Sequence, residues 1–457
     1  MKSSGTFLRY CSLLLFITLT AISCRSGTSP KQTGSNRTVL SDDQLLDSIQ
    51  YRTFQYFWDG AEPNSGLARE RFHVDGVYPQ DDKHIITSGG SGFGLMALVV
   101  GMERGFITRE QGMQRLEKAV GFLETSDRFH GVWPHWLNGE TGEVKPFSTK
   151  DNGGDLVETA YLVQGLLTVR QYLDQGNGEE AGLAGRITSL CNGVEWDWYQ
   201  KGGEPVLYWH WSPQYDWEMN HQIRGYNECL ITYVLGASSP THPITTDAYH
   251  QGWARGGEIR GENYKYGLLL DMNHNGDREY GGPLFWAHYS YLGLDPRNLK
   301  DTYSDYWQHN RNHTLINYHY CVENPHQFKG YGENCWGLTA SYSLKGYAAH
   351  SPANDLGVIS PTAALSSMPY TPEESLRAAR YFYDSLGSEL MGPYGFYDAF
   401  SIEEDWFPQR YLAIDQGPII VMIENYRSGL LWNLFMKNGE VQAGLDRLGF
   451  RYKSSPE

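Results

Sequence analysis

The chain has 457 residues and a formal net charge of −16 at pH 7. This charge argues against a nucleic-acid partner, because binding a polyanion requires clustered lysine and arginine to neutralise phosphates. The 14 tryptophans and 32 tyrosines are unusual for a sequence whose mean hydropathy is negative. Sugar-binding clefts place aromatic rings beside hydrogen-bonding side chains, so the composition favours a glycan ligand, although a core built from large residues would account for many of these rings.

The first residues have the pattern of an export signal. Lys2 and Arg9 precede an apolar stretch from Leu13 to Ile22, which is shorter than a membrane span and fits the core of a signal peptide. The stretch ends at Cys24 in a sequence that resembles a bacterial lipobox. We therefore expect residues 1–23 to be removed and Cys24 to be lipidated, giving an exported lipoprotein of the periplasm or outer membrane that its lipid alone attaches. The alternative is ordinary cleavage near Ala21.

Residues 24–40 are rich in serine, threonine, glycine and asparagine, which predicts a flexible tether. Residues 41–457 then continue without a low-complexity break, as one large domain. Stretches with one polar face alternate with stretches that are apolar nearly all round, as outer and inner helices would. This alternation predicts an all-α (α/α)6 toroid of about six inner and six outer helices, a count that the stretches leave open by one. The polar-faced stretches lie near 42–59, 108–125, 182–198, 243–254, 299–317, 371–386 and 438–448, and the apolar ones near 94–104, 155–170, 220–235, 283–293, 336–368 and 415–435.

Loops and helix N-termini gather at one end of such a toroid, so acids where inner helices start are candidate site residues. Asp151, Asp155 and Glu158 are spaced by four and three residues, and a helix through all of them would place them on one face. Asp155 and Glu158 also have the spacing of a capping box, which by itself would explain Asp155. Because three stacked acids repel one another, we expect at least one to be catalytic.

Glu228 stands in an apolar stretch that is expected to form a buried helix. An ionised glutamate is rarely buried without a partner. Burial raises the pKa of a carboxyl, as a general acid that works near neutral pH requires. Glu228 is therefore the predicted proton donor, and the alternative is an ion pair with Arg224, four residues earlier.

Asp415 precedes the last apolar stretch, in which Pro418 suits a first helical turn. Asp415 is expected at the mouth of the cleft, either as a helix cap or as the catalytic base. Glu424 lies deeper in the same stretch, and Arg427 follows it by three residues, so we expect those two side chains to form an ion pair.

Other motifs indicate neither a metal nor a cofactor, and none is expected. Residues 89–94 read GGSGFG, but with no strand expected before them they predict a close backbone approach and not a nucleotide loop. Residues 271–277 begin like a calcium loop but lack its twelfth-position glutamate, which leaves a weak calcium site as an alternative. Four cysteines remain after the signal, without a CxxC pair that would indicate zinc. Both a Cys321–Cys335 disulfide and buried free thiols stay open.

Several long segments together resemble the bacterial glucoamylase-like proteins of glycoside hydrolase family 144, the β-1,2-glucanases. They include YNECLITYVLG, PLFWAHYSYLGLDPR, ENCWGLTAS, ISPTAALSSMPYTPEES, YGFYDAF and IDQGPIIVMIENYRSGLLW. The resemblance covers about residues 51–449 and implies an (α/α)6 fold and hydrolysis of β-1,2-linked glucose chains. It also implies that the essential acids are Asp151, Asp155, Glu158, Glu228 and Asp415. Residues 340–350 depart from the pattern of the family.

The predicted mechanism is inverting hydrolysis. Glu228 would protonate the glycosidic oxygen and Asp415 would activate a water on the opposite face, with the two carboxyls about 6.5 to 9.5 Å apart, or farther if water relays the proton. The acids at 151–158 would orient the substrate or the water. Two alternatives are a non-catalytic glycan-binding lipoprotein and an enzyme of the same fold that acts on another glycan. Endo or exo action stays open, and a monomer is expected. The candidate sugar-binding residues are Trp133, His135, Trp136, Trp209, Trp211, Tyr289, Trp336, Tyr397, Trp406 and Gln416.

Overall fold

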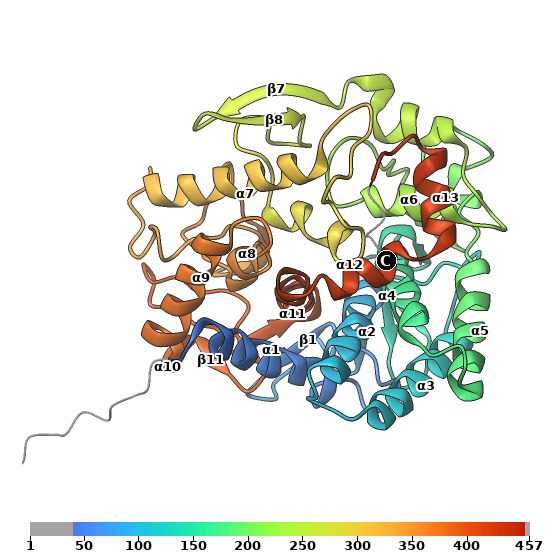
Figure 1. Cartoon of the computed structure of the whole chain (residues 1–457), viewed down its shortest axis with the longest axis horizontal. Coiled ribbons are helices and arrows are strands. Elements are labelled where there is room, and N and C mark those ends of the chain that lie inside the picture. The colour runs from blue at the N-terminus through green and yellow to red at the C-terminus, as the bar shows by residue number, and fades with distance from the viewer. Residues whose placement is uncertain (1–39, 453–457) are drawn as a thin grey trace, which may run out of the picture. The chain divides into compact units, whose positions relative to one another are not determined.

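Helices make up most of the regular structure in residues 40–452, which are the residues that the computed structural model describes (Figure 1). The predicted signal segment and Cys24 lie outside them, as does the tether apart from Leu40. The α-helices are α1 (Asp42–Trp58), α2 (Ser88–Glu103), α3 (Arg109–Thr125), α4 (Leu156–Tyr172), α5 (Gly178–Asn192), α6 (Leu230–Ser238), α7 (Tyr306–Glu323), α8 (Pro361–Leu365), α9 (Pro372–Arg380), α10 (Gly387–Leu390), α11 (Ala413–Arg427), α12 (Leu430–Met436) and α13 (Gly439–Arg447).

Two classes of helix are distinguished by burial, as the alternating pattern predicts. Helices α2, α4, α6, α8 and α11 are buried nearly all round, whereas α1, α3, α5, α7, α9 and α13 each keep an exposed face. Capping boxes begin α1 at Ser41 and α3 at Thr108, where side chain and backbone satisfy each other's hydrogen bonds. Among the described residues no helix is both long enough and apolar enough to cross a bilayer.

Helices α2 and α4 pack with their backbones in direct contact. A Cβ atom on Gly92 would lie 2.2 Å from the carbonyl oxygen of Tyr161, and one on Gly165 would lie 2.2 Å from that of Gly92. The glycine-rich run at 89–94 therefore serves close helix packing, as predicted. A three-residue strand, β2 (Ile85–Thr87), does precede the run, which corrects the expectation that none would.

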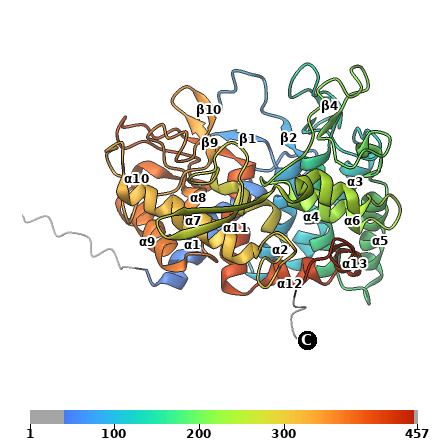
Figure 2. The same cartoon turned by 90° about the horizontal axis from the view of Figure 1, so that it is seen from above.

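The described residues also form short strands, so the fold is mostly helical and not all-α as predicted. They are β1 (Arg71–His73), β2, β3 (Trp136–Asn138), β4 (Val144–Lys145), β5 (Gly154–Asp155), β6 (His210–Trp211), β7 (Arg260–Lys265), β8 (Leu268–Met272), β9 (Ala340–Ser343), β10 (Gly346–Ala349), β11 (Met391–Gly392), β12 (Gly395–Phe396) and β13 (Arg410–Leu412). Figure 2 shows β1, β2, β4, β9 and β10 on one side of the helical body. Antiparallel pairing sets Arg71 opposite Leu412 and Asp155 opposite His210, so distant segments meet there.

Three predicted inner helices are shorter than their apolar stretches. Helix α6 begins only at Leu230, and Gly225, with a φ of +75°, already separates residues 220–225 from it. Residues 283–293 form two 3₁₀ turns, η4 (Leu284–Ala287) and η5 (Tyr289–Tyr291), which meet at His288, where φ widens to −114°. Residues 336–368 contain the β9–β10 hairpin and only the five-residue α8.

The remaining short elements are η1 (Trp198–Gln200), η2 (Ala248–Trp253, a π-helix), η3 (Arg255–Gly257) and η6 (Tyr381–Ser385, a π-helix). Cys191, Cys229, Cys321 and Cys335 are all free and buried. Of the two open interpretations, the structure has the buried thiols and not the Cys321–Cys335 bridge.

Candidate active site

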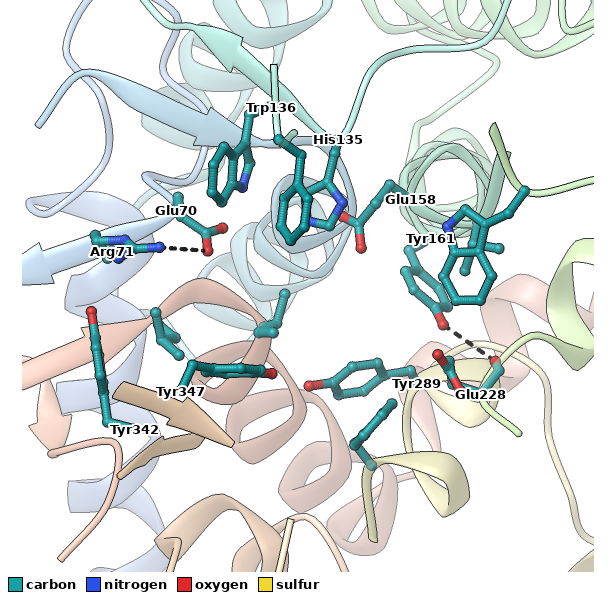
Figure 3. A pocket seen from close by; sticks show the side chains of 16 residues that line it. Glu70, Arg71, His135, Trp136, Glu158, Tyr161, Glu228, Tyr289, Tyr342 and Tyr347 are labelled. Carbon is teal, nitrogen blue, oxygen red and sulfur yellow. Dashed lines mark hydrogen bonds and ion pairs between the residues drawn. The ribbon is translucent and has the colours of Figure 1, made fainter. Parts of the chain in front are cut away.

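A cavity of about 300 Å³ lies among the short strands and the starts of the buried helices (Figure 3). Its wall combines acids with aromatic rings, which is the composition expected of a sugar-binding cleft. The carboxyls of Glu70 and Glu158 point toward its centre. The lining residues are Glu70, Arg71, His135, Trp136, Phe147, Val157, Glu158, Tyr161, Trp209, Glu228, Phe285, Tyr289, Tyr342, Tyr347, Leu412 and Ile414.

The start of α4 supplies one acidic wall. Asp155 is the N-cap, and its Oδ1 accepts from the backbone N–H groups of Val157 and Glu158 at 3.0 and 2.9 Å. Glu158 does not complete a capping box. Its Oε2 accepts instead from the N–H of Gly89 at 2.8 Å and the hydroxyl of Thr87 at 3.2 Å, so α2 holds this carboxyl at the cavity.

Asp151 joins this wall by a different route from the one predicted. The helix does not run through it, since α4 begins at Leu156, and a loop brings Asp151 back to the cluster. His210 Nε2 lies 3.4 Å from Asp151 Oδ2 and 3.7 Å from Asp155 Oδ2. His135 Nδ1 lies 3.1 Å from Asp155 Oδ2.

The members of this cluster differ in the direction in which their pKa values are shifted. Burial tends to lower the pKa of His135, but the charges of Glu158 and Asp155 outweigh it and raise that pKa to about 10. Burial raises the pKa of Glu158 to about 7, and burial together with the charge of Asp155 raises that of Asp151 to about 7. Although burial opposes it, the hydrogen bond from His135 keeps the pKa of Asp155 below its usual value. Burial lowers the pKa of His210 to about 4. Near pH 7 the cluster therefore contains an imidazolium, a carboxylate and two acids that can exchange protons.

The same cluster has the ligand types of a metal site. One nitrogen of His135 and one oxygen each of Asp151 and Asp155 lie within 4.8 Å of one another. The positive charge of His135 gives these acids a cationic partner from the protein itself. Sequence reasoning predicted His135 only as a sugar contact and did not identify His210.

Glu228 lines the cavity from the turn before α6, two residues short of the helix in which it was expected. The hydroxyls of Tyr161 (3.3 Å) and Ser290 donate to its backbone carbonyl and fix this turn. Burial raises the pKa of Glu228 to about 7. The alternative ion pair with Arg224 is not formed, and no cation pairs with Glu228 among residues 40–452. Arg224 donates instead to the Gln222 side chain and the Gln251 carbonyl.

Asp415 is in the first turn of α11 but does not cap it, and Pro418 lies one turn further in than predicted. Its neighbours Leu412 and Ile414 line the cavity, whereas Asp415 is 1% exposed and lies behind the wall. Burial, followed by the charge of Asp398, raises the pKa of Asp415 well above its usual range. Burial raises the pKa of Asp398 to about 6.

Four of the predicted sugar-binding residues line the cavity: His135, Trp136, Trp209 and Tyr289. The other six do not. Trp133 and Trp336 are core residues whose indole N–H groups donate to backbone carbonyls. The Trp211 ring packs against the rings of Phe129, His130 and Trp198, and the Tyr397 ring packs against Tyr411. The Gln416 side-chain amide donates a hydrogen bond to the Phe396 carbonyl. Trp406 lies on a loop, where its backbone pairs with that of Ser401. The sequence alone does not indicate whether a tryptophan side chain faces the cavity or the core.

Sequence reasoning missed the opposite wall, where Glu70, Arg71, Tyr342 and Tyr347 lie. Arg71 Nη2 is 3.5 Å from Glu70 Oε1, and the guanidinium is 5.9 Å from the Trp136 ring centroid. These residues come from short strands and loops, where helical periodicity gives no signal. Asp398 was also missed, although it is the one acid in the YGFYDAF segment.

Two acidic segments that were assigned no catalytic role from the sequence do not line the cavity, and the ion pair predicted for one of them is wrong. Glu424 pairs with Arg104, at 2.7 and 2.9 Å, and not with Arg427, whose partner is Asp47. Asp271 of the calcium-like segment accepts from the Ser304 hydroxyl and lies 2.6 Å from His309 Nδ1, so it links β8 to α7.

Comparison with known proteins places this geometry in a family. The Glycoamylase family model, described as "Putative glucoamylase", matches residues 220–439. The solved endo-β-1,2-glucanase of Chitinophaga pinensis, in complex with sophorotriose and glucose, is 63% identical, with a TM-score of 0.90 over 91% of this chain and 99% of that one. Glucoamylase from Hormoconis resinae resembles the chain in fold alone, with 10% identity and a TM-score of 0.50 over 84% of this chain and 73% of that one.

Among curated relatives, the exo β-1,2-glucooligosaccharide sophorohydrolase (non-reducing end) of Parabacteroides distasonis is 47% identical over 426 residues. The match covers 90% of this chain but only 58% of that protein, so the chain spans little more than half of its length. High identity over almost the whole of a solved relative nevertheless shows the family. This chain belongs to the glucoamylase-like proteins of glycoside hydrolase family 144.

Proposed function

We propose that this chain is a glycoside hydrolase that cleaves β-1,2-linked glucan. The observation that carries the proposal is that Glu158 and Glu228 both lie in the wall of an aromatic cavity, and that no arginine or lysine forms a salt bridge with either carboxyl among residues 40–452. Both have a pKa of about 7, which suits proton transfer near neutral pH. The identity to an endo-β-1,2-glucanase and to a sophorose-releasing enzyme supports the linkage.

In the proposed mechanism Glu228 donates its proton to the glycosidic oxygen as the bond to the anomeric carbon breaks. A carboxylate on the other face takes a proton from water, and the resulting hydroxide attacks the anomeric carbon with inversion. Glu158, held by Gly89 and Thr87, can orient that water directly. Asp415 lies behind the wall, so as the base it would receive the proton through a relay. The hydroxyls of Tyr289 and Tyr347, which line the cavity and sense the charge of Asp415, are the groups that could carry it.

Three further parts of the proposal concern architecture and location. The alternation of buried and half-exposed helices, with the likeness to a glucoamylase, supports an (α/α)6 toroid of six inner and six outer helices. The lipobox-like sequence at Cys24 supports an exported lipoprotein of the periplasm or outer membrane. The proposed partner is a β-glucan chain, bound by a monomer.

The test is to incubate the purified protein with linear β-1,2-glucan and to follow product size and anomeric form with time. We expect sophorose or short β-1,2-oligosaccharides whose new reducing end is first released as the α-anomer. A ladder of products would indicate endo action, and a single disaccharide would indicate exo action. Glu404→Gln, an exposed loop carboxylate, is the matched control for Glu228→Gln. Binding without any product would support the non-catalytic alternative.

A further inference from the structure

A second aspartate lies against the predicted base. Asp398 follows β12, is 1% exposed, and its carboxyl is in contact with that of Asp415. One of its oxygens, Oδ2, accepts from the backbone N–H of Tyr342 at 2.7 Å. The other oxygen of Asp398 and both oxygens of Asp415 are fully buried and meet no donor among the described residues.

Two ionised carboxylates cannot hydrogen-bond to each other, and unpaired charges buried in contact are strongly unfavourable. A single proton between the two groups removes both problems, since one carboxyl then donates to the other. Pairs of buried carboxyls in contact behave in this way and titrate as a unit. We infer that Asp398 is a positioning residue that shares one proton with Asp415, so that the pair carries a single negative charge and can accept one further proton.

The groups around the pair do not supply an alternative counter-ion. The negative charge of Glu70, before β1, disfavours ionisation of both aspartates, whereas Arg71 favours that of Asp398. The remaining titratable groups that sense the pair are phenols on η5, β9 and β10, namely Tyr289, Tyr342 and Tyr347. Tyr289 and Tyr347 point their hydroxyls toward each other in the cavity wall, between the two elements (Figure 3).

This inference deepens the proposed function and rests on it for the consequence in catalysis. It explains how a carboxyl as deeply buried as Asp415 could take part in proton transfer: the pair, and not Asp415 alone, is the group that gains the proton. The shared proton itself is a property of the folded protein and can be detected whether or not the chain hydrolyses glucan.

The test uses infrared spectra of the full-length protein labelled with ¹³C-aspartate, recorded at pH 8 to 9, where Asp151 is largely ionised. We expect one protonated aspartate in the wild type that is lost in both Asp398→Asn and Asp415→Asn. Asparagine at 398 keeps an oxygen for the Tyr342 N–H and offers an N–H to Asp415, which then ionises. A protonated band that persists in Asp398→Asn would overturn the inference, as would its absence from the wild type.

The catalytic readout is the pH profile of kcat/KM on β-1,2-glucan. The acidic limb reports the gain of a second proton by the pair. In Asp398→Asn it should move to higher pH, because an amide N–H stabilises the Asp415 carboxylate less than a carboxyl O–H does, and kcat should be altered more than KM. Asp277→Asn, a buried aspartate away from the cavity that accepts two backbone N–H groups, is the matched control and should keep the wild-type profile. An unshifted acidic limb in Asp398→Asn would contradict a role for the pair in turnover, while the infrared result would still decide the shared proton.

Discussion

The buried carboxyls of Glu158 and Glu228 at the cavity and that of Glu424 near the C-terminus of α11 have opposite pKa shifts, because their polar partners differ. Glu424 is bound through both oxygens by Arg104 and also accepts from Gln50 (3.1 Å) and Ser428 (2.6 Å). Burial opposes its ionisation, but these partners outweigh burial and lower its pKa. Glu228 and Glu158 have no arginine or lysine partner in the part of the chain that the structure describes, and burial raises their pKa values to about 7.

The difference indicates which buried acids are structural. A carboxyl that stays ionised and holds elements together has a bidentate arginine and further donors, whereas one that exchanges a proton has no arginine or lysine to keep it ionised. The following predictions test this comparison, starting with the largest expected effect.

Replacing Glu228 by glutamine should lower kcat on β-1,2-glucan by about 10³-fold, because the amide cannot donate the proton that the leaving oxygen needs. Affinity for unhydrolysed oligosaccharide, measured by calorimetry, should change little. A variant that retains more than about a tenth of wild-type kcat would assign the acid to another residue. Glu424→Gln should not produce this loss of kcat at temperatures where it is folded.

Replacing Arg104 by alanine should destabilise the protein by about 3 kcal/mol, because Glu424 is left as an uncompensated buried charge. The free energy of unfolding from urea titration at pH 7 gives the number. The difference in this free energy between the variant and the wild type should become smaller as pH falls. In the wild type, the stabilisation from ionised Glu424 is present above the unfolded pKa of Glu424 and is lost as pH falls through its lower folded pKa. An equal loss at all pH values would point to packing and not to charge.

The catalytic variant should have the opposite pH dependence of stability. Because the folded pKa of Glu228 is raised to about 7, its favourable contribution is present below its unfolded pKa and is lost as pH rises through about 7. Glu228→Gln should therefore be more stable than the wild type at pH 8, by about 3 kcal/mol, and equally stable near pH 4. The comparison fails if its Tm at pH 8 is not raised.

The smallest expected effect concerns the rings. Trp136→Ala should weaken oligosaccharide binding by about 1 kcal/mol with little change in stability, because the ring lines the cavity. Trp336→Ala should instead lower the free energy of unfolding by about 3 kcal/mol, because that ring is fully buried in the core. Binding titrations and urea unfolding of both variants would separate the two roles. Similar effects of the two substitutions on binding would be evidence against this division.

The sequence by itself determined the helical character of the chain, the family, and the acids Asp151, Asp155, Glu158 and Glu228 around the site. Helical periodicity and capping patterns are local, so α1, α3 and α4 begin within a residue or two of where they were predicted. The motifs of a family are likewise runs of consecutive residues, so they can be recognised in the sequence without the fold. These signals do not show which side a tryptophan faces, and six of the ten predicted sugar contacts lie elsewhere.

Only the tertiary structure decided which groups meet. Arg104 and Glu424 are 320 residues apart, and β1 brings Glu70 and Arg71 to the start of α11 through its pairing with β13. Asp398 reaches Asp415 across the long loop between β12 and β13, where the Asp398 backbone N–H donates to the Arg410 carbonyl at 3.0 Å. The ionisation of an acid depends on burial and on neighbours within a few ångströms, and neither quantity is contained in the spacing of residues along the chain.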